Sequence, residues 1–136
     1  MKHAFRKIAL LIGSALLANP ALAEDGSWGQ RFYDQTCATC HGGAGTGDGN
    51  LADWLSIEVP DLTTLSERNG GEFPMLRVID IIDGRIKLRA HEDPMPLYGE
   101  KFRNELQPEY GMAGAAHTLI RGRILSIAEY LRTIQK

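Results

Sequence analysis

Five consecutive residues, Cys37, Ala38, Thr39, Cys40 and His41, contain both cysteines of the chain, with a histidine directly after the second. This C-x-x-C-H spacing is the attachment pattern of a c-type haem. Each thiol can form a thioether with one of the two vinyl groups of a porphyrin, and the next residue then offers an imidazole to the iron. The pattern therefore predicts one covalently attached haem c, held through Cys37 and Cys40 and ligated by His41.

Three other uses of the same five residues fit the sequence less well. A zinc site needs four ligands, usually from a second Cys/His pair, and the remaining histidines His3, His91 and His117 lack that spacing. A thioredoxin-like dithiol requires a strand–helix pattern that is absent around the motif. A disulfide across two intervening residues would close a very small loop and add little stability. Haem attachment is the preferred interpretation, with zinc, dithiol and disulfide as its alternatives.

A haem iron held by one histidine has a sixth position, whose occupant separates electron transfer from gas binding and catalysis. The sequence offers five candidates for it, namely Met75, Met95, Met112, His91 and His117. Met95 lies between Pro94 and Pro96, which stiffen the backbone and can hold a weakly binding thioether in place. It also follows His41 by 54 residues, enough chain to reach the opposite face of a porphyrin. We predict a His41/Met95 ligand pair, with His91 or an open position as the alternatives.

A histidine and a methionine together favour electron transfer. A thioether stabilises ferrous iron more than a second imidazole would and raises the reduction potential. With both axial positions filled, oxygen and peroxide have no place to bind. The predicted ligands therefore indicate a one-electron carrier and not an enzyme.

The spacing of apolar residues predicts helices on both sides of the motif. The first is expected over residues 28–40, with Asp25 and Ser27 as candidate caps. The second is expected over residues 74–83, beginning at a proline and ending before Gly84. In the last helix, from residue 119 or 120 onward, apolar side chains form one continuous stripe, namely Ile120, Ile124, Ile127, Leu131 and Ile134. This last stripe is interpreted as core, and the fold class as all-α.

The segments between these helices are predicted to be largely irregular. Residues 42–50 contain five glycines in nine positions, which suits a loop that passes close to a flat ligand. A phosphate-binding loop is discounted because the Walker lysine and the preceding strand are missing. A short helix is expected over residues 51–56 with Trp54 pointing inward, and residues 87–99 are expected to be irregular because prolines flank Met95.

The N-terminal residues predict export. Lys2, Arg6 and Lys7 precede an apolar run, and an Ala-Leu-Ala site ends at Ala23, which is the pattern of a secretory signal peptide over residues 1–23. An uncleaved anchor is the alternative, although the run is too short to span a bilayer. Export agrees with the motif, because C-x-x-C thiols of bacteria meet haem outside the cytoplasm. We therefore expect a periplasmic protein.

Residues 24–136 then form one domain. Without the first 23 residues the chain has 12 basic and 17 acidic side chains, a net charge of about −5. Such a charge argues against binding to nucleic acid or an anionic membrane. No second stretch of the sequence reads as a membrane span, and we expect a monomer.

The motifs taken together resemble the small single-haem class I c-type cytochromes, over nearly all of residues 24–136. The resemblance rests on the Cys37–His41 motif with its following Gly-Gly and Gly-Asp-Gly, on Met95-Pro96 followed by Tyr98-Gly99, and on the terminal residues 128–131. At Tyr98 the chain departs from the family, where tryptophan is frequent.

The resemblance implies an all-α cytochrome c fold of three to five helices wrapped round one haem. In that family the first and last helices cross at a glycine against an aromatic residue, which Gly29 and Tyr33, with Ile127 and Tyr130, match. One haem edge is expected near the surface for electron exchange. The resemblance leaves the partners of the haem propionates open among four residues, Trp54, Arg68, Arg85 and Tyr98.

Three functions fit these expectations. The first is a periplasmic shuttle between redox proteins such as respiratory or dehydrogenase complexes. The second is the haem subunit of a larger periplasmic dehydrogenase or oxidase. The third is a catalytic or sensory haem protein with a labile sixth ligand. The single C-x-x-C-H motif counts against a di-haem peroxidase, and we expect the first.

Overall fold

The computed structural model describes residues 27–86, 97–111 and 114–136. Within these ranges the regular structure is entirely helical, which confirms the all-α prediction. The α-helices are α1 (Trp28–Thr36), α2 (Ala38–His41), α3 (Leu65–Arg68), α4 (Met75–Asp83), α6 (Tyr98–Tyr110) and α7 (Ala115–Thr133). Two 3-10 helices, η1 (Ala52–Trp54) and η2 (Leu62–Thr64), lie between α2 and α3.

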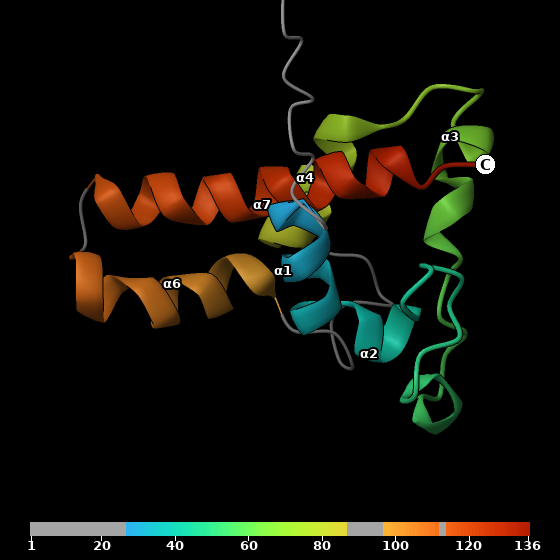
Figure 1. Cartoon of the computed structure of the whole chain (residues 1–136), viewed down its shortest axis with the longest axis horizontal. Helices are drawn as coiled ribbons and strands as arrows, with labels where there is room; N and C mark the ends of the chain where they lie inside the picture. The colour runs from blue at the N-terminus through green and yellow to red at the C-terminus, as the bar shows by residue number, and fades with distance from the viewer. Residues whose placement is uncertain (1–26, 87–96, 112–113) are drawn as a thin grey trace, which may run out of the picture.

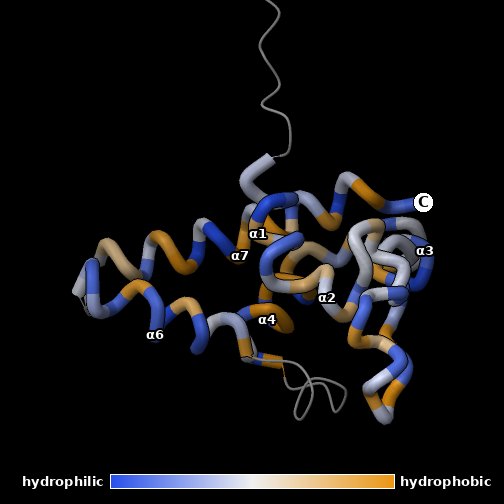
Figure 2. Tube along the Cα trace, turned by 60° about the horizontal axis from the view of Figure 1, so that its bottom comes forward, coloured by the Kyte–Doolittle hydropathy of each residue, from blue (hydrophilic) through white to orange (hydrophobic). Residues whose placement is uncertain are grey.

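The long helix α7 is the element against which the others pack. Helices α1, α4 and α6 all contact it, and in Figure 1 α1 crosses α7 near its middle while α6 lies alongside its first half. The predicted apolar stripe forms the contact face, since Ile120, Ile124, Ile127 and Leu131 are all buried. Its last member, Ile134, is the C-cap residue and is partly buried against the same core. Figure 2 shows the same recurrence of apolar residues along α7. The stripe is therefore core, as its spacing predicted.

Helix α7 begins at Ala115, earlier than the predicted start at residue 119 or 120. Gly114 precedes it with a φ of 72°, and the Thr118 hydroxyl donates to the Gly114 carbonyl at 3.0 Å. Ala116 is buried in the core cluster. The prediction missed this first turn because residues 115–118 include no large apolar side chain that would extend the stripe.

The crossing of α1 and α7 depends on Gly29. A Cβ atom at this position would overlap the Ser126 carbonyl oxygen and would lie 2.9 Å from Cβ of Tyr130. Tyr33, one turn later, is fully buried and its ring centre lies 5.2 Å from that of Tyr130. The Tyr33 hydroxyl donates to the Gly42 carbonyl at 2.6 Å. The predicted crossing of the first and last helices is confirmed, and it is tied directly to the residue after His41.

The predicted helix over residues 28–40 is interrupted. Helix α1 ends at Thr36 and α2 begins at Ala38, with Cys37 between them at a φ of −112°. The Thr36 hydroxyl donates to the Phe32 carbonyl at 2.5 Å, a local bond that competes with regular helix geometry. At the start of α1, Ser27 is the cap, because its hydroxyl accepts from the Gln30 amide. Asp25 lies outside the described residues.

The prediction for residues 51–56 was wrong about Trp54. Only the single 3-10 turn η1 forms, and the Trp54 side chain is 83% exposed. This turn is attached through its backbone, because the Leu51 amide donates to the Thr39 carbonyl and the Ala52 amide to the Gly49 carbonyl. Because backbone hydrogen bonds already fix this turn, burial of the Trp54 side chain is not required to hold it in place. Trp54 therefore faces solvent.

Helix α4 follows its prediction closely. It covers Met75–Asp83, with Pro74 as its N-cap and Gly84 in the left-handed conformation as its C-cap. Val78 and Ile82, four residues apart, are buried on one face of the helix. The side chain of Leu97 packs against Gly84, so the start of α6 lies at the end of α4.

Helix α6 was not predicted, and its first residues, Tyr98 and Gly99, fall in a stretch expected to be irregular. Its buried side chains Tyr98, Phe102 and Leu106 recur every four residues, a signal that the prolines before them obscured. Arg123 of α7 is shared between α1 and α6, because its guanidinium lies 5.3 Å from the ring centres of both Phe32 and Phe102.

In the described parts of the chain, no helix combines the length and the apolar character that crossing a membrane requires.

Candidate haem site

An apolar pocket of about 250 Å³ brings Cys37 and His41 together. Its walls come from four parts of the chain: the α1–α2 junction, residues 60–68, α4 and α7. The apolar lining consists of Pro60, Leu62, Leu65, Val78, Ile81, Ile82, Ile127 and Leu131. A flat apolar macrocycle is the kind of ligand that such walls suit. The pocket thus lies where the motif meets the core.

The His41 ring is oriented by a backbone carbonyl. His41 is buried, and its Nδ1 lies 3.3 Å from the carbonyl oxygen of Pro60. In the tautomer with the proton on Nδ1, this nitrogen donates to Pro60 and Nε2 carries the lone pair. A metal-ligating histidine usually makes such a bond from its other nitrogen. The arrangement therefore suits Nε2 as an iron ligand.

The two cysteines of the motif differ in their surroundings. Cys37 is buried and lines the pocket, whereas Cys40 is half-buried and does not. Both thiols are free in the structure. Burial is the main reason that the pKa of the Cys37 thiol is raised to about 11, which keeps it protonated at neutral pH. The backbone amides of Cys40 and His41 both donate to the Cys37 carbonyl, so one helical turn fixes the spacing of all three side chains.

Two arginines complete the lining of the pocket. Arg68 is held by the carbonyls of Asp61 and Thr64, at 2.6 and 3.3 Å from its nitrogens. Arg77, on α4, makes no ion pair with any carboxylate of the described residues, and neither does Arg68. Cations at the mouth of an otherwise apolar pocket suit the carboxylates that a haem carries on one edge. Sequence reasoning named Arg68 and missed Arg77, although Arg77 lies only one residue before the buried Val78.

The other candidates for the propionates lie elsewhere. Trp54 is exposed on its own turn, and Arg85 pairs with Asp83 at 2.6 Å on the surface. The Tyr98 hydroxyl donates to the carbonyl of Thr36. The phenol therefore joins α6 to the residue before Cys37, and none of the three lines the pocket.

Among the candidates for the sixth ligand, the structure describes only two. Met75 is half-buried and packs against the core, and His117 is exposed on α7. Neither lines the pocket with His41. Met95, His91 and Met112 lie outside the described residues.

Tyr98 gives a test of the contact between α6 and the motif. Burial is the main reason that the pKa of its phenol is raised to about 12. Because this pKa is higher in the folded than in the unfolded protein, the phenol stabilises the fold at pH values below its unfolded pKa of about 10. This stabilisation is lost as the pH rises from about 10 to 12. We expect Tyr98→Phe to lower the free energy of unfolding by about 1–3 kcal/mol at pH 7, because the Thr36 carbonyl loses its donor. The variant should also lose less stability than the wild type between pH 9 and 12.

Urea unfolding at a series of pH values measures both effects. Equal loss of stability in the two proteins over this alkaline range would contradict the role given to Tyr98.

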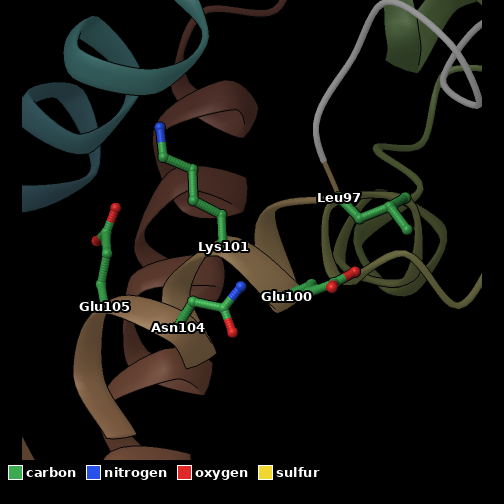
Figure 3. Close-up of a pocket in the computed structure, with 5 residues that line it drawn as sticks. All are labelled: Leu97, Glu100, Lys101, Asn104 and Glu105. Atoms are coloured by element: carbon green, nitrogen blue, oxygen red, sulfur yellow. The ribbon is translucent and has the colours of Figure 1, made fainter. Parts of the chain in front are cut away.

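A second hollow, of about 430 Å³, lies along α6. Figure 3 shows the five residues that line it, namely Leu97, Glu100, Lys101, Asn104 and Glu105. All belong to the first part of α6 or immediately precede it, and none is a candidate haem residue. In the described ranges, no three His, Cys, Asp or Glu side chains gather so as to hold a metal ion.

The residues of the first pocket fit a covalently bound haem. A buried thiol and an oriented imidazole lie on one helical turn, apolar walls surround them, and two guanidinium groups that pair with no described carboxylate border the same pocket. These are the donors that attachment, iron ligation and carboxylate binding require.

The comparison with protein families agrees with this chemistry. A family model described as Cytochrome c matches residues 27–135, which is more than half of the chain and includes the motif and every helix of the described residues. No curated protein and no solved structure matches the chain. With its all-α fold, the crossing of α1 and α7 and the site around Cys37 and His41, the chain belongs to the cytochrome c family.

Proposed function

We propose that this cytochrome carries single electrons between redox proteins through one haem c, attached at Cys37 and Cys40 and ligated by His41 and Met95. Membership of the family implies a covalent haem c and electron transfer in place of catalysis. The observation that carries the proposal is the placing of Cys37 and His41 in one apolar pocket, with the Pro60 carbonyl against Nδ1.

When bound, the haem supplies a reversible one-electron couple. The chain supplies the surroundings: the Pro60 carbonyl lies against Nδ1 of the His41 ring, and α4 and α7 contribute apolar walls. Apolar walls contain few dipoles that must reorient when the charge of the iron changes, so little reorganisation accompanies each transfer. This is what a carrier needs.

Met95 is proposed as the sixth ligand on three grounds. The two described alternatives, Met75 and His117, do not line the pocket. Residues 97 and 98, two and three positions after Met95, are held in place, because Leu97 packs against Gly84 at the end of α4 and Tyr98 donates to Thr36. Flanking prolines in the sequence give the thioether the preorganisation that a weak ligand needs.

The test of the proposed function is a redox titration of the purified protein, produced in a bacterial host that attaches haem to C-x-x-C-H motifs. We expect one haem per chain by mass spectrometry and a fully reversible titration with one electron. A chain without covalent haem, or a haem that turns over peroxide in place of cycling reversibly, would contradict the proposal.

The periplasm is the proposed location, on the strength of the signal-peptide pattern in residues 1–23. Sequencing of the N-terminus after fractionation of the native host tests it, and we expect cleavage after Ala23. The same fractions test the proposed partners, which are separate donor and acceptor proteins such as respiratory or dehydrogenase complexes. A protein that purifies alone supports the free shuttle, whereas one that stays with a larger subunit would make it the haem subunit of an enzyme complex.

Arg68 and Arg77 are proposed to hold the haem propionates, since they are the two cations in the pocket lining. We expect Arg77→Gln to lower the reduction potential, because removing a nearby positive charge stabilises the more positive ferric state. Arg103→Gln is the matched control, as Arg103 is exposed on α6 and does not line the pocket. Electrochemistry measures both variants, and equal potentials in Arg77→Gln and Arg103→Gln would rule out the assignment.

A further inference from the structure

The residues after α7 are joined by side-chain hydrogen bonds to the segment that follows Pro60. Gln135 donates from Nε2 to the Leu62 carbonyl at 2.8 Å, and its Oε1 accepts from the Ser66 amide at 2.9 Å. The same Nε2 also donates to the Leu131 carbonyl at 2.7 Å. Gln135 is half-buried, so water competes only weakly for these bonds. One amide side chain thus fixes two residues of the segment to the end of α7.

The other side of the segment faces the haem site. The Leu62 amide donates to the Gly45 carbonyl at 2.7 Å, and the Gly47 amide donates to the His41 carbonyl at 2.8 Å. Two residues before Leu62, the Pro60 carbonyl lies 3.3 Å from Nδ1 of His41. Leu62 is therefore held on one side by the loop after His41 and on the other by Gln135.

We propose that Gln135 is a positioning residue for the haem ligand, which holds the Pro60 carbonyl against His41 by fixing Leu62 and so lowers the reduction potential. This inference rests on the proposed function, since it requires His41 on the iron. A hydrogen bond from Nδ1 makes the imidazole a stronger donor, and a stronger donor favours ferric iron. Loosening the Pro60 carbonyl weakens this bond and shifts the balance toward ferrous iron.

The side chain of the neighbouring Lys136 does not position this segment. Its amide donates to the Thr63 carbonyl at 2.9 Å, a bond that survives any change of side chain. Its ammonium group lies 3.3 Å from Asp61 Oδ2, but the side chain is 63% exposed, and exposed ion pairs contribute little. The side-chain link between the end of α7 and this segment therefore depends on Gln135.

The test uses the haem-loaded protein with Gln135→Met, which keeps a side chain of similar length and removes the groups that bond Leu62 and Ser66. The control is Thr133→Val, which removes the bond from Thr133 to the Tyr130 carbonyl at the same helix end without touching residues 60–66. Two properties are measured: the reduction potential, and the exchange of the His41 Nδ1 proton with solvent in the ferrous protein by NMR.

For Gln135→Met we expect a higher reduction potential and about tenfold faster exchange of the Nδ1 proton, because local opening of the segment becomes easier. Thr133→Val should change neither property. If the methionine variant fails to fold, Gln135→Glu replaces it, since the carboxylate still accepts from Ser66 but no longer donates to Leu62. Its added negative charge lowers the potential by itself, so this variant is judged by the Nδ1 proton, whose exchange should again be faster.

Unchanged potential and exchange in a folded Gln135 variant would overturn the inference, even if its melting temperature fell. This failure is distinguishable from that of the proposed function. If only the inference about Gln135 is wrong, the wild type still shows its reversible couple and the Gln135 variant shows the same potential and proton exchange. If the proposed function is wrong, the wild type itself lacks that couple.

Discussion

Replacing both Cys37 and Cys40 with alanine is expected to abolish covalent attachment of the haem completely. Haem that enters the pocket of this variant would be held by ligation and packing alone, and would separate from the chain on denaturation. The melting temperature should also fall, because haem that is not covalently attached can dissociate, and it then stabilises the folded state only as far as its free concentration exceeds its dissociation constant. Mass spectrometry of the denatured protein and thermal unfolding measure the two effects.

The matched control for this variant is Thr39→Ala. Thr39 lies between the cysteines and uses its backbone carbonyl to accept from the Leu51 amide, which alanine retains. This variant should therefore keep its haem and its stability. Haem that remains on the denatured double variant would show that another residue attaches it.

A second large effect is expected from Gly29→Ala. The new Cβ would overlap the Ser126 carbonyl oxygen and lie 2.9 Å from Tyr130 Cβ, so α1 and α7 must move apart. Overpacking of this kind costs about 1–3 kcal/mol, and this outweighs the gain of about 1 kcal/mol that alanine brings to a helix. The crossing also carries Tyr33 and its bond to Gly42, so the haem site should loosen with it. Urea unfolding of the haem-loaded protein measures the loss.

Gly122→Ala provides the control, since Gly122 lies on α7 and a Cβ there meets no atom within 4 Å. It should raise the free energy of unfolding, by up to about 1 kcal/mol, through helix propensity alone. The opposite signs of the two substitutions are the specific expectation. Stabilisation by Gly29→Ala would mean that the helices do not cross as described.

The features that could be predicted from the sequence are those carried by local signals. The spacing of Cys37, Cys40 and His41 is a covalent requirement, and it predicted the haem before any fold was known. The sequence also predicted the apolar stripe of α7 and the two ends of α4, at Pro74 and Gly84. These features depend only on residues within about one helical turn. The crossing of α1 and α7 is the exception, because it joins distant segments and was predicted from the family resemblance and not from a local signal.

What could not be predicted depends on contacts between distant segments. The outward position of Trp54 follows from backbone bonds of its turn to residues 39 and 49, and the break at Cys37 from a side-chain bond of Thr36, neither of which an apolar periodicity records. Arg77 borders the pocket because α4 packs against α7, and Gln135 reaches Leu62 across 73 residues of sequence. Such residues are polar and carry no spacing signal, so only the folded arrangement identifies them.

The proposed function depends on His41 and Met95 filling both axial positions of a single haem, because an open position would allow gas binding or catalysis. The most direct measurement is the absorption spectrum of the ferrous protein under carbon monoxide at neutral pH, for the wild type and for Met95→Ala. A wild-type spectrum that carbon monoxide leaves unchanged, beside a variant that binds the gas readily, is the predicted result. Ready binding of carbon monoxide by the wild type would contradict the account.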